Sequence, residues 1–303
     1  MSKIEPVLTI GLPTYNGEKT IKRTIDSILS QTFSNFQLII SDDGSTDSTP
    51  EICREYIKKD NRIKFVQRKG KRGPVWNFIF LAEKSNTKYF VWIAHDDYWG
   101  SQFIEKNIEI LETNPKIVGS ISDVQLVGLN IKNYYTNQKI PDSKYIDSKY
   151  TPTKFEFVRP NKGTYDEKVK NILEFTWVLN FYSVFRTEKL KESLVDNAFA
   201  GWDWTLVLNI AKFGDLHVLD EVLAYRDTGG ITSRSTIERF KTEKVGWFKT
   251  YFPFVPITIW CLRNIGLKKF IIHNAYFRYL NFHTAKKIFR ELINRGEVSQ
   301  NKS

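Results

Sequence analysis

The first 94 residues alternate short apolar segments with amphipathic ones, and this alternation leaves few folds open to the chain. Four runs rich in β-branched and aromatic residues predict buried strands: residues 7–12, 36–40, 63–66 and 89–94. Three segments between those runs carry helix signals: residues 21–29, 48–51 and 74–83. Strands and helices that alternate at this spacing predict parallel βαβ units, with right-handed crossovers and helices on both faces of the sheet.

The pattern is weaker further along the chain. Residues 125–160 mix Tyr, Lys, Asn and Asp with few apolar periods, so we interpret them as loops and edge strands. Apolar periodicity returns in three segments: residues 167–179, 182–185 and 204–213. Beyond them, residues 216–219 and 222–225 predict a pair of strands.

A chain of 303 residues can bury a sizeable core as one large domain with an appendage. We therefore expect an α/β fold over residues 1–232, with a mostly parallel mixed sheet and flanking helices. Within it, residues 1–120 should form a nucleotide-binding type of half-domain, and residues 121–232 the second half. A helical extension over residues 233–303 should follow.

Nearly all of the net charge of +11 lies in the last quarter of the chain, where residues 232–303 hold 14 Lys and Arg against four acids, or 14 − 4 = +10. The same region is rich in Trp, Phe and Tyr. Its longest uncharged run, Thr250–Leu262, contains two prolines and is shorter than the ~20 residues of a spanning helix. Aromatic residues among cations favour peripheral contact with an anionic bilayer. One alternative is a helical subdomain whose aromatic residues form its core. The other is nucleic-acid binding, but no nucleic-acid-binding motif accompanies the charge. A homodimer contact is a further use of this region.

Two features bear on the compartment. Cys53 and Cys261 match neither a disulfide framework nor a zinc site, and they are interpreted as reduced, buried thiols. Residues 1–6 lack the apolar stretch of a signal peptide. We therefore expect a cytoplasmic protein, peripheral on the inner face of the cell membrane.

Polar clusters follow three of the predicted strands, at residues 13–17, 41–47 and 95–99. In an open α/β sheet the ligand binds beyond the carboxyl ends of the strands. Each cluster taken alone also suits a turn or a helix cap, because Asn-Gly, Asp-Gly and Asp are common there. Three clusters at the same end of consecutive parallel strands favour a binding site.

The segments LTIGLPTYNGEKTIKRTIDSILSQTF, FQLIISDDGSTDST and YFVWIAHDDYW resemble the inverting glycosyltransferases of family 2. The resemblance covers about residues 5–230, in the order that the family has. It implies the nucleotide-diphospho-sugar transferase fold, of the GT-A, Rossmann-like type, with residues 121–232 as the half that would bind the acceptor. A shared fold does not fix function by itself, so each site residue needs its own argument.

By this resemblance, one set of residues would bind the nucleotide: Pro13, Tyr15, Asn16, Glu18, Asp42 and Asp43. Asp42 would accept a hydrogen bond from the pyrimidine, while Glu18 would lie near the ribose. Lys71 or Arg72 and, after the last strand, Arg226 would reach the diphosphate. For Arg226 the alternative is a surface ion pair with Asp227 or Glu221, which would contribute little.

His95-Asp96-Asp97 stands where the family has its metal-binding acidic motif. Mg2+ or Mn2+ held by one or two carboxylates would neutralise the diphosphate and stabilise the leaving nucleotide. Asp97 would be the more direct ligand and Asp96 the second. The sequence departs from the family at Ala94, which replaces the first acid of the motif, and His95 is either a support for the ligands or structural.

The family also has an acidic motif at the start of a later helix, which supplies the base that deprotonates the acceptor hydroxyl. Asp203 matches its second acid and is our candidate base, whereas Trp202 replaces the first. The alternative role for Asp203 is to cap the helix that follows. Trp202 and Trp204 are candidates for stacking on acceptor sugars.

The resemblance thus predicts an inverting enzyme that transfers a single sugar from a nucleotide-diphospho-sugar, most often UDP-linked in this family. The expected acceptor is a saccharide or a lipid-linked molecule of surface polysaccharide or glycolipid synthesis. The Gln-x-x-Arg-Trp signature of processive synthases is absent from the sequence. One alternative is a catalytically degenerate family member that acts as a nucleotide-sugar-binding or membrane scaffold. Another is a nucleotidyltransferase, but the position of its Gly-rich loop reads PTYNGEK.

Overall fold

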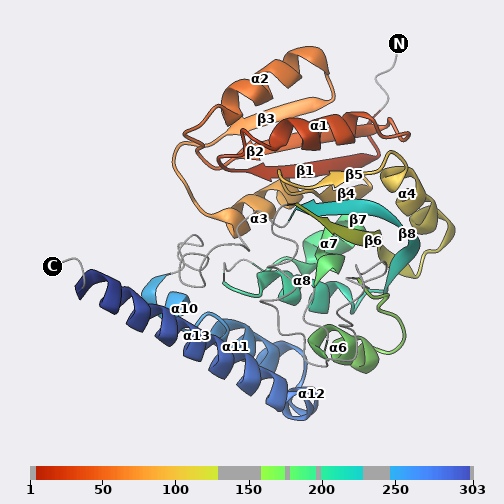
Figure 1. Ribbon diagram of the computed structural model, residues 1–303. Helices are drawn as coiled ribbons and strands as arrows, with labels where there is room; N and C mark the ends of the chain where they lie inside the picture. Colours follow the sequence, from red (N-terminus) through yellow and green to blue (C-terminus); the bar gives the residue numbers. More distant parts are fainter. Residues whose placement is uncertain (1–4, 129–157, 175–177, 196–198, 228–245, 301–303) are drawn as a thin grey trace, which may run out of the picture.

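One mixed β-sheet forms the centre of the fold (Figure 1). The computed structural model describes residues 5–128, 158–174, 178–195, 199–227 and 246–300. Within these residues, eight strands follow one another across the sheet in the order β3-β2-β1-β4-β7-β6-β8-β5.

The first half of the sheet is parallel, as predicted. Its strands are β1 (Leu8–Thr14), β2 (Phe36–Asp42), β3 (Ile63–Gln67) and β4 (Tyr89–Trp92). β1 pairs with both β2 and β4, and β2 pairs with β3, in each case parallel. The connecting helices are α1 (Ile21–Leu29), α2 (Thr49–Lys59) and α3 (Pro74–Lys84). This arrangement brings the carboxyl ends of β1, β2 and β4, with the polar residues that follow them, to one edge.

The second half is mixed. Its elements are β5 (Tyr98–Trp99), α4 (Phe103–Thr113), β6 (Ile117–Val127), α6 (Tyr165–Glu174), the 3₁₀ turn η2 (Leu179–Tyr182), β7 (Val184–Arg186), α7 (Thr187–Ser193), α8 (Trp202–Ile210) and β8 (Asp215–Asp227). β7 runs antiparallel to β4 and β6, β8 is parallel to β6, and β5 adds to β8 antiparallel. β8 thus delivers its last residues beside the loop that follows β4.

The predicted pair of strands at residues 216–219 and 222–225 was wrong, because both segments belong to the single 13-residue strand β8. The polar residues Asp220 and Glu221 stay in the strand, exposed, and the register against β6 shifts at Ser122–Val124. β6 also continues through Gln125–Val127, where we expected loops and edge strands. Most of the remaining segment, residues 129–157, lies outside the described residues.

The two faces of the sheet carry separate apolar cores. Alternation along β4 shows this directly, since Tyr89 and Val91 join the core under α1, α2 and α4, whereas Phe90 and Trp92 join the core under α3, α6, α7 and α8. The period of two along a strand produces this division. The result is a three-layer α/β/α arrangement, as the sequence predicts.

The predicted helical C-terminal extension is confirmed in its described part. It consists of α10 (Gly246–Tyr251), α11 (Val255–Asn264), α12 (Leu267–Ile272) and α13 (Asn274–Gln300), which lie together below α8 in Figure 1. Ile257, Cys261 and Phe277 are buried in the core that α8 also joins. No helix in the described part of the chain is both long and apolar enough to cross a bilayer.

Candidate active site

The loops after β1 and β2 are tied together at the edge where the parallel strands end. Asn16 takes a left-handed backbone conformation (φ 51°), and its side-chain oxygen accepts a hydrogen bond from the Thr46 amide at 2.9 Å. The Asn16 amide donates to Ser45 Oγ at 2.8 Å. Glu18 accepts from the Ser48 amide at 3.1 Å. Asn16 and Glu18, two of the predicted nucleotide-binding residues, therefore hold the two loops together through their hydrogen bonds.

Asp42 and Asp43, the acidic pair after β2, are both buried. The Asp42 carboxylate accepts hydrogen bonds from the amide and the hydroxyl of Ser45, and burial raises the pKa of Asp42. Asp43 accepts from the amides of Arg72 at 2.9 Å and Gly73 at 2.8 Å, at the start of α3. A carboxylate offers about four acceptor positions, so the contacts with Ser45 leave part of the capacity of Asp42 for a base.

The segment before α3 also returns to the loop after β1. The Lys71 ammonium lies 4.0 Å from the ring centroid of Tyr15, in cation–π geometry. Pro13, at the end of β1, is buried, whereas Tyr15 is partly exposed. The structure thus gathers the predicted nucleotide residues and Lys71 at one edge of the sheet, where their roles in binding stay predictions.

Asp97 is the most deeply placed acid in the loop after β4. Its side chain is 8% exposed, and its Oδ1 accepts a hydrogen bond from the Asp227 amide at 3.0 Å. Its backbone carbonyl accepts from Thr24 Oγ1 at 2.7 Å. Burial raises the pKa of Asp97 to about 7, with Arg226 opposing the rise and Asp96 adding to it. A carboxylate in these surroundings gains from a nearby cation.

Arg23 of α1 holds the end of β8 against this loop. Its guanidinium donates to the Asp96 carbonyl at 2.6 Å and to the Asp227 carboxylate at 3.1 Å. It also lies 4.8 Å from the ring centroid of Tyr98, which stacks on Tyr225. Asp227 is therefore fixed at both its amide and its carboxylate. Sequence reasoning missed Arg23, because nothing in an exposed helical position indicates a partner 204 residues away.

His95 supports the same loop. Its Nδ1 lies 3.2 Å from Thr20 Oγ1, and its carbonyl accepts from Thr24 Oγ1 at 2.9 Å. The ring packs against Gly17, where an added Cβ would lie 2.8 Å from Nδ1. The contacts give His95 a structural role at the N-terminal end of α1.

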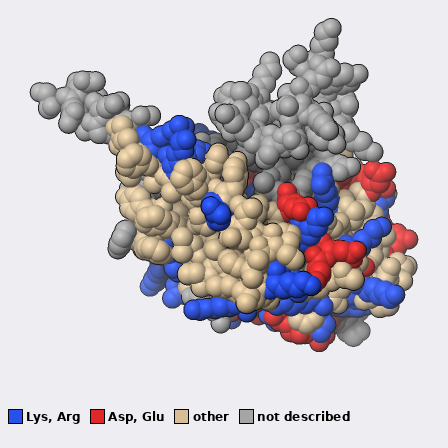
Figure 2. Space-filling model, turned by 90° about the horizontal axis from the view of Figure 1, so that it is seen from below, with Lys and Arg blue, Asp and Glu red and all other residues tan. Residues whose placement is uncertain are grey.

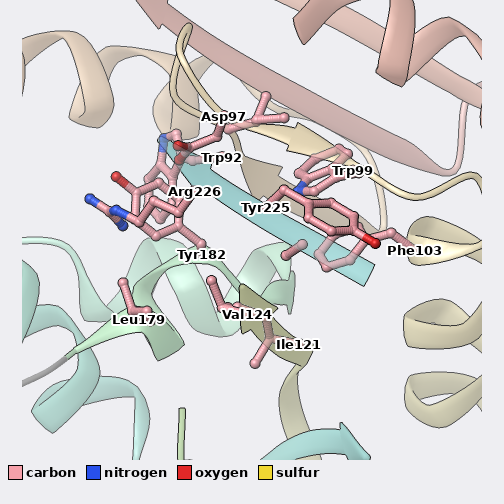
Figure 3. A pocket seen from close by; sticks show the side chains of 12 residues that line it. Trp92, Asp97, Trp99, Phe103, Ile121, Val124, Leu179, Tyr182, Tyr225 and Arg226 are labelled. Atoms are coloured by element: carbon pink, nitrogen blue, oxygen red, sulfur yellow. The ribbon is translucent and has the colours of Figure 1, made fainter. Parts of the chain in front are cut away.

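A pocket opens between Asp97 and the aromatic residues of β5, α4 and β8 (Figure 3). It encloses about 340 Å³ of space, part of which is open to solvent. Arg226 lies against Tyr182 at one end, with its guanidinium carbon 4.7 Å from the ring centroid, and Tyr225 lies at the other. Of the two acids considered as partners of Arg226, Asp227 forms an ion pair with Arg23 and Glu221 forms one with Lys106.

Tyr182 shows that the candidate metal ligands and the candidate base share one electrostatic environment. Burial raises the pKa of Tyr182 to about 12, while Arg226 opposes the rise and Asp97, Asp96 and Asp203 add to it. Three carboxylates from two distant segments thus act on one phenol. Sequence reasoning missed Tyr182, because its pattern indicates only an apolar segment.

Asp203 lies in the first turn of α8 with its side chain exposed. The cap of α8 is Gly201, which takes the left-handed conformation (φ 85°) that favours glycine. The alternative role of Asp203 as the helix cap was therefore wrong. Its assignment as the base stays a prediction.

The expected stacking of Trp202 and Trp204 on sugars was also wrong. Trp202 is 3% exposed and donates its indole N–H to the Val195 carbonyl at 2.8 Å. Trp204 is 8% exposed and stacks on Phe254, the residue before α11. Because most residues of α8 are buried, both tryptophan rings lie in the core.

The residues present fit a divalent cation that the substrate helps to bind. In the described residues no three His, Cys, Asp or Glu side chains cluster to form a complete protein site. Mg2+ commonly uses only one or two carboxylates together with substrate phosphates, and Asp97 with Asp96 can supply these. Burial raises the pKa of Asp97 by more than the charge of Arg226 lowers it, so a further cation would favour the ionised carboxylate.

Solved structures resemble this fold at low sequence identity. The S. aureus TarS 1-349 complex with UDP-GlcNAc aligns with 84% of this chain and 66% of its own, at a TM-score of 0.58 and 18% identity. The mannosyltransferase PcManGT from Pyrobaculum calidifontis, in complex with GDP-Man and Mn2+, aligns with 97% of this chain and 76% of its own, at 0.56 and 15%. These likenesses concern the fold.

Curated relatives match about a third to a half of the chain. The Escherichia coli UDP-Glc:alpha-D-GlcNAc-diphosphoundecaprenol beta-1,3-glucosyltransferase WfgD is 28% identical over 165 residues, 54% of this chain and 56% of that protein. The putative teichuronic acid biosynthesis glycosyltransferase TuaG of Bacillus subtilis (strain 168) is 31% identical over 111 residues, 37% of this chain and 44% of that protein. The chain spans about half the length of these relatives.

The family model described as glycosyl transferase family 2 matches residues 9–173, which is more than half of the chain and contains every strand-end cluster described above. With the sheet order and the acidic loop after β4, this match establishes that the chain belongs to glycosyl transferase family 2.

Proposed function

We propose that this glycosyltransferase is metal-dependent and inverting, and that it moves one sugar from a nucleotide-diphospho-sugar to a saccharide or lipid-linked acceptor. The observation that carries the proposal is the pocket that Asp97, Tyr182 and Arg226 line together, where the charges of Asp96, Asp97 and Asp203 all raise the pKa of Tyr182. A diphosphate leaving group and an acceptor hydroxyl need these groups of opposite charge close together.

Asp203 is the proposed base. The acceptor hydroxyl oxygen forms a bond to the anomeric carbon, while the bond from that carbon to the diphosphate oxygen breaks. The electron pair leaves with the nucleoside diphosphate, and the hydroxyl proton passes to the Asp203 carboxylate. Asp203 suits this role because its side chain is exposed at the start of α8, where an acceptor hydroxyl can reach it. One displacement without a covalent intermediate inverts the anomeric centre.

Arg226 and the cation would stabilise the departing diphosphate. A Mn2+ or Mg2+ ion held by Asp97 and Asp96 supplies positive charge to the leaving phosphates when bound. Arg226 already lowers the pKa of Asp97 by its charge, so it lies close enough to act on a ligand at that carboxylate. The family and a fold neighbour that binds Mn2+ support a divalent metal.

Relatives support the choice of donor and acceptor. TarS binds UDP-GlcNAc, and WfgD is a UDP-Glc transferase that acts on a diphosphoundecaprenol-linked sugar. We infer a UDP-linked donor, bound by Pro13, Tyr15, Asn16, Glu18, Asp42 and Asp43. We also infer an acceptor of surface polysaccharide or glycolipid synthesis, reached by peripheral contact with the inner face of the cell membrane. The homodimer stays a prediction, to be measured by light scattering.

Nucleotide release tests the proposal. A panel of UDP-, GDP- and dTDP-sugars is incubated with the native chain and Mn2+, and the released nucleotide is measured with a coupled phosphatase. We expect release from one donor, loss of release with EDTA, and loss in Asp97→Ala. Release that persists in EDTA and in Asp97→Ala would show that the metal assignment is wrong.

The alternative is a catalytically degenerate scaffold, which Ala94 and Trp202 favour because each replaces an acid of the family motif. Trp202 is buried and cannot substitute for a solvent-accessible carboxylate. Nucleotide binding without turnover of any donor, even with membrane extract as acceptor, would support the scaffold.

A further inference from the structure

Helix α13 carries apolar residues on two separate faces. Phe277 and Ile288, at 1% and 3% exposed, mark the face that packs on the rest of the protein. Phe282 and Phe289, at 70% and 64%, lie on the other side. A helix that is apolar on one side only needs a single packing partner, whereas apolar residues on two faces need a second.

The exposed residues form one line along the helix, which we call the exposed stripe: Tyr279, Phe282, Lys286, Phe289 and Ile293. Their spacing of three, four, three and four residues places them on a single face. The four apolar members are 47% to 70% exposed. The adjoining helix α12 has no buried residue, and Leu267, Ile271 and Ile272 are 63% to 64% exposed.

The charge around the stripe is almost all positive. Residues 246–293 contain eight Lys and Arg and a single acid, Glu291. Figure 2 shows the molecule from below, the side on which α11, α12 and α13 lie in Figure 1. A broad area there has few charged residues, which are Lys and Arg, and the Asp and Glu in view lie mainly to the right of it and below it in Figure 2.

We propose that the exposed stripe docks on a bilayer that contains anionic phospholipid. Aromatic and aliphatic side chains enter the boundary between headgroups and acyl chains, and flanking cations meet lipid phosphates. The helix lies in the interface rather than crossing it, consistent with the absence of a spanning helix from the described residues.

Charge favours a membrane over a second copy of the chain. A two-fold dimer through the stripe would set the same surface against itself, so the surrounding Lys and Arg would face like charges. An anionic bilayer offers the opposite charge over the whole surface. The inference deepens the proposed function, on which it rests for the lipid-linked acceptor, but binding to lipid can be measured without any transfer.

Vesicle flotation tests the docking directly. The full chain is mixed with vesicles of phosphatidylcholine alone or of phosphatidylcholine with phosphatidylglycerol, and the bound fraction is measured. We expect binding to the mixed vesicles and, because two or more cations contribute, at least about tenfold weaker binding to the neutral ones.

Two pairs of substitutions separate the apolar and the charged contributions. Phe282→Ser with Phe289→Ser should weaken binding to mixed vesicles by about tenfold or more, because two rings no longer enter the bilayer. Phe213→Ser is the matched control, since Phe213 is 41% exposed but follows α8. Lys286→Gln with Arg290→Gln should weaken binding by about tenfold. The control for charge is Lys58→Gln with Lys116→Gln, two exposed lysines elsewhere on the molecule.

Other occupants of the stripe would give different results. Equal binding of the native chain and the Phe282→Ser/Phe289→Ser variant would overturn the proposal. So would a dimer in light scattering that this variant breaks, without vesicle binding, since the second copy would then cover the stripe. If the native chain binds no mixed vesicle, the proposal is also overturned, and an acidic protein becomes the expected partner of the exposed stripe. Vesicle binding without nucleotide release would support the docking while counting against the proposed function.

Discussion

Replacing Asp97 by Asn should stabilise the protein in a pH-dependent way. The native pKa of Asp97 is raised from 3.8 to about 7, mainly by burial. Asn keeps a side-chain oxygen that can accept the hydrogen bond from the Asp227 amide at 3.0 Å. The substitution therefore removes the buried charge while it preserves the shape and the main contact of the side chain.

The sign follows from the two pKa values. Because the folded pKa lies above the unfolded one, the folded state keeps its proton where the unfolded state has lost it. The contribution of Asp97 to the free energy of unfolding is therefore fully present below about pH 4 and is lost as the pH rises through about 7. The full difference of about three pKa units corresponds to an upper limit of about 4 kcal/mol. Between pH 5 and pH 8 the change is about 2–3 kcal/mol.

Thermal unfolding without divalent metal measures this effect. For a chain of this size, 1 kcal/mol shifts Tm by roughly 2 °C, so Asp97→Asn should gain about 4–6 °C relative to the native chain between pH 5 and pH 8. Comparing the two pH values cancels any constant cost of the amide. Asp220→Asn, at an exposed carboxylate of β8, is the control and should show little change.

Addition of Mn2+ provides a second arm of the same experiment. The ion should raise the Tm of the native chain at pH 8 and leave that of Asp97→Asn nearly unchanged, because ligand binding stabilises only the state that binds. A difference between the two chains that stays constant from pH 5 to pH 8 would refute the argument. An Asp97→Asn variant whose Tm falls relative to that of the native chain as the pH rises would refute it equally.

The remaining predictions concern the surroundings of Asp97. Arg23→Gln should raise the KM for the donor severalfold, and it should lower Tm by less than about 2 °C because the ion pair with Asp227 is partly exposed. The charge swap Arg23→Asp/Asp227→Arg should restore part of the native KM, and a KM that is not restored would contradict a positioning role for Arg23. Gly17→Ala should cost about 1–3 kcal/mol in unfolding free energy, because its Cβ would lie 2.8 Å from His95 Nδ1, and His95→Ala should relieve the loss in the double variant. Arg226→Gln should move Mn2+ binding, followed by titration calorimetry, to higher pH, because Arg226 lowers the pKa of Asp97; binding with an unchanged pH dependence would contradict this.

The sequence predicted the features that depend on short stretches of chain. The strands of the first 94 residues follow from continuous apolar runs, and the acidic loop at Asp97 follows from the rule that sites lie at the carboxyl ends of parallel strands. β8 was harder to predict, because Asp220 and Glu221 interrupt the apolar pattern. A strand that is exposed in its middle can carry such residues without ending.

The parts of the site that the sequence did not predict depend on contacts between distant segments. Arg23 donates a hydrogen bond to Asp227 across 204 residues, and Tyr182 lines the same pocket as Asp97 because β7 lies between β4 and β6 in the sheet. Trp202 is a second example, since its type suits either a sugar platform or a core. Only the packing of α8 on the ring of Trp92 decides that it lies in the core.

The most direct test of the account is the rate of sugar transfer to a lipid-linked acceptor by the native chain and by Asp203→Asn, at saturating donor and Mn2+. Removal of a general base should reduce the rate by about 10²–10⁴-fold and leave donor binding unchanged. Transfer at the native rate in Asp203→Asn would contradict the assignment of the base. Absence of transfer by the native chain, with every donor that it binds, would contradict catalysis itself.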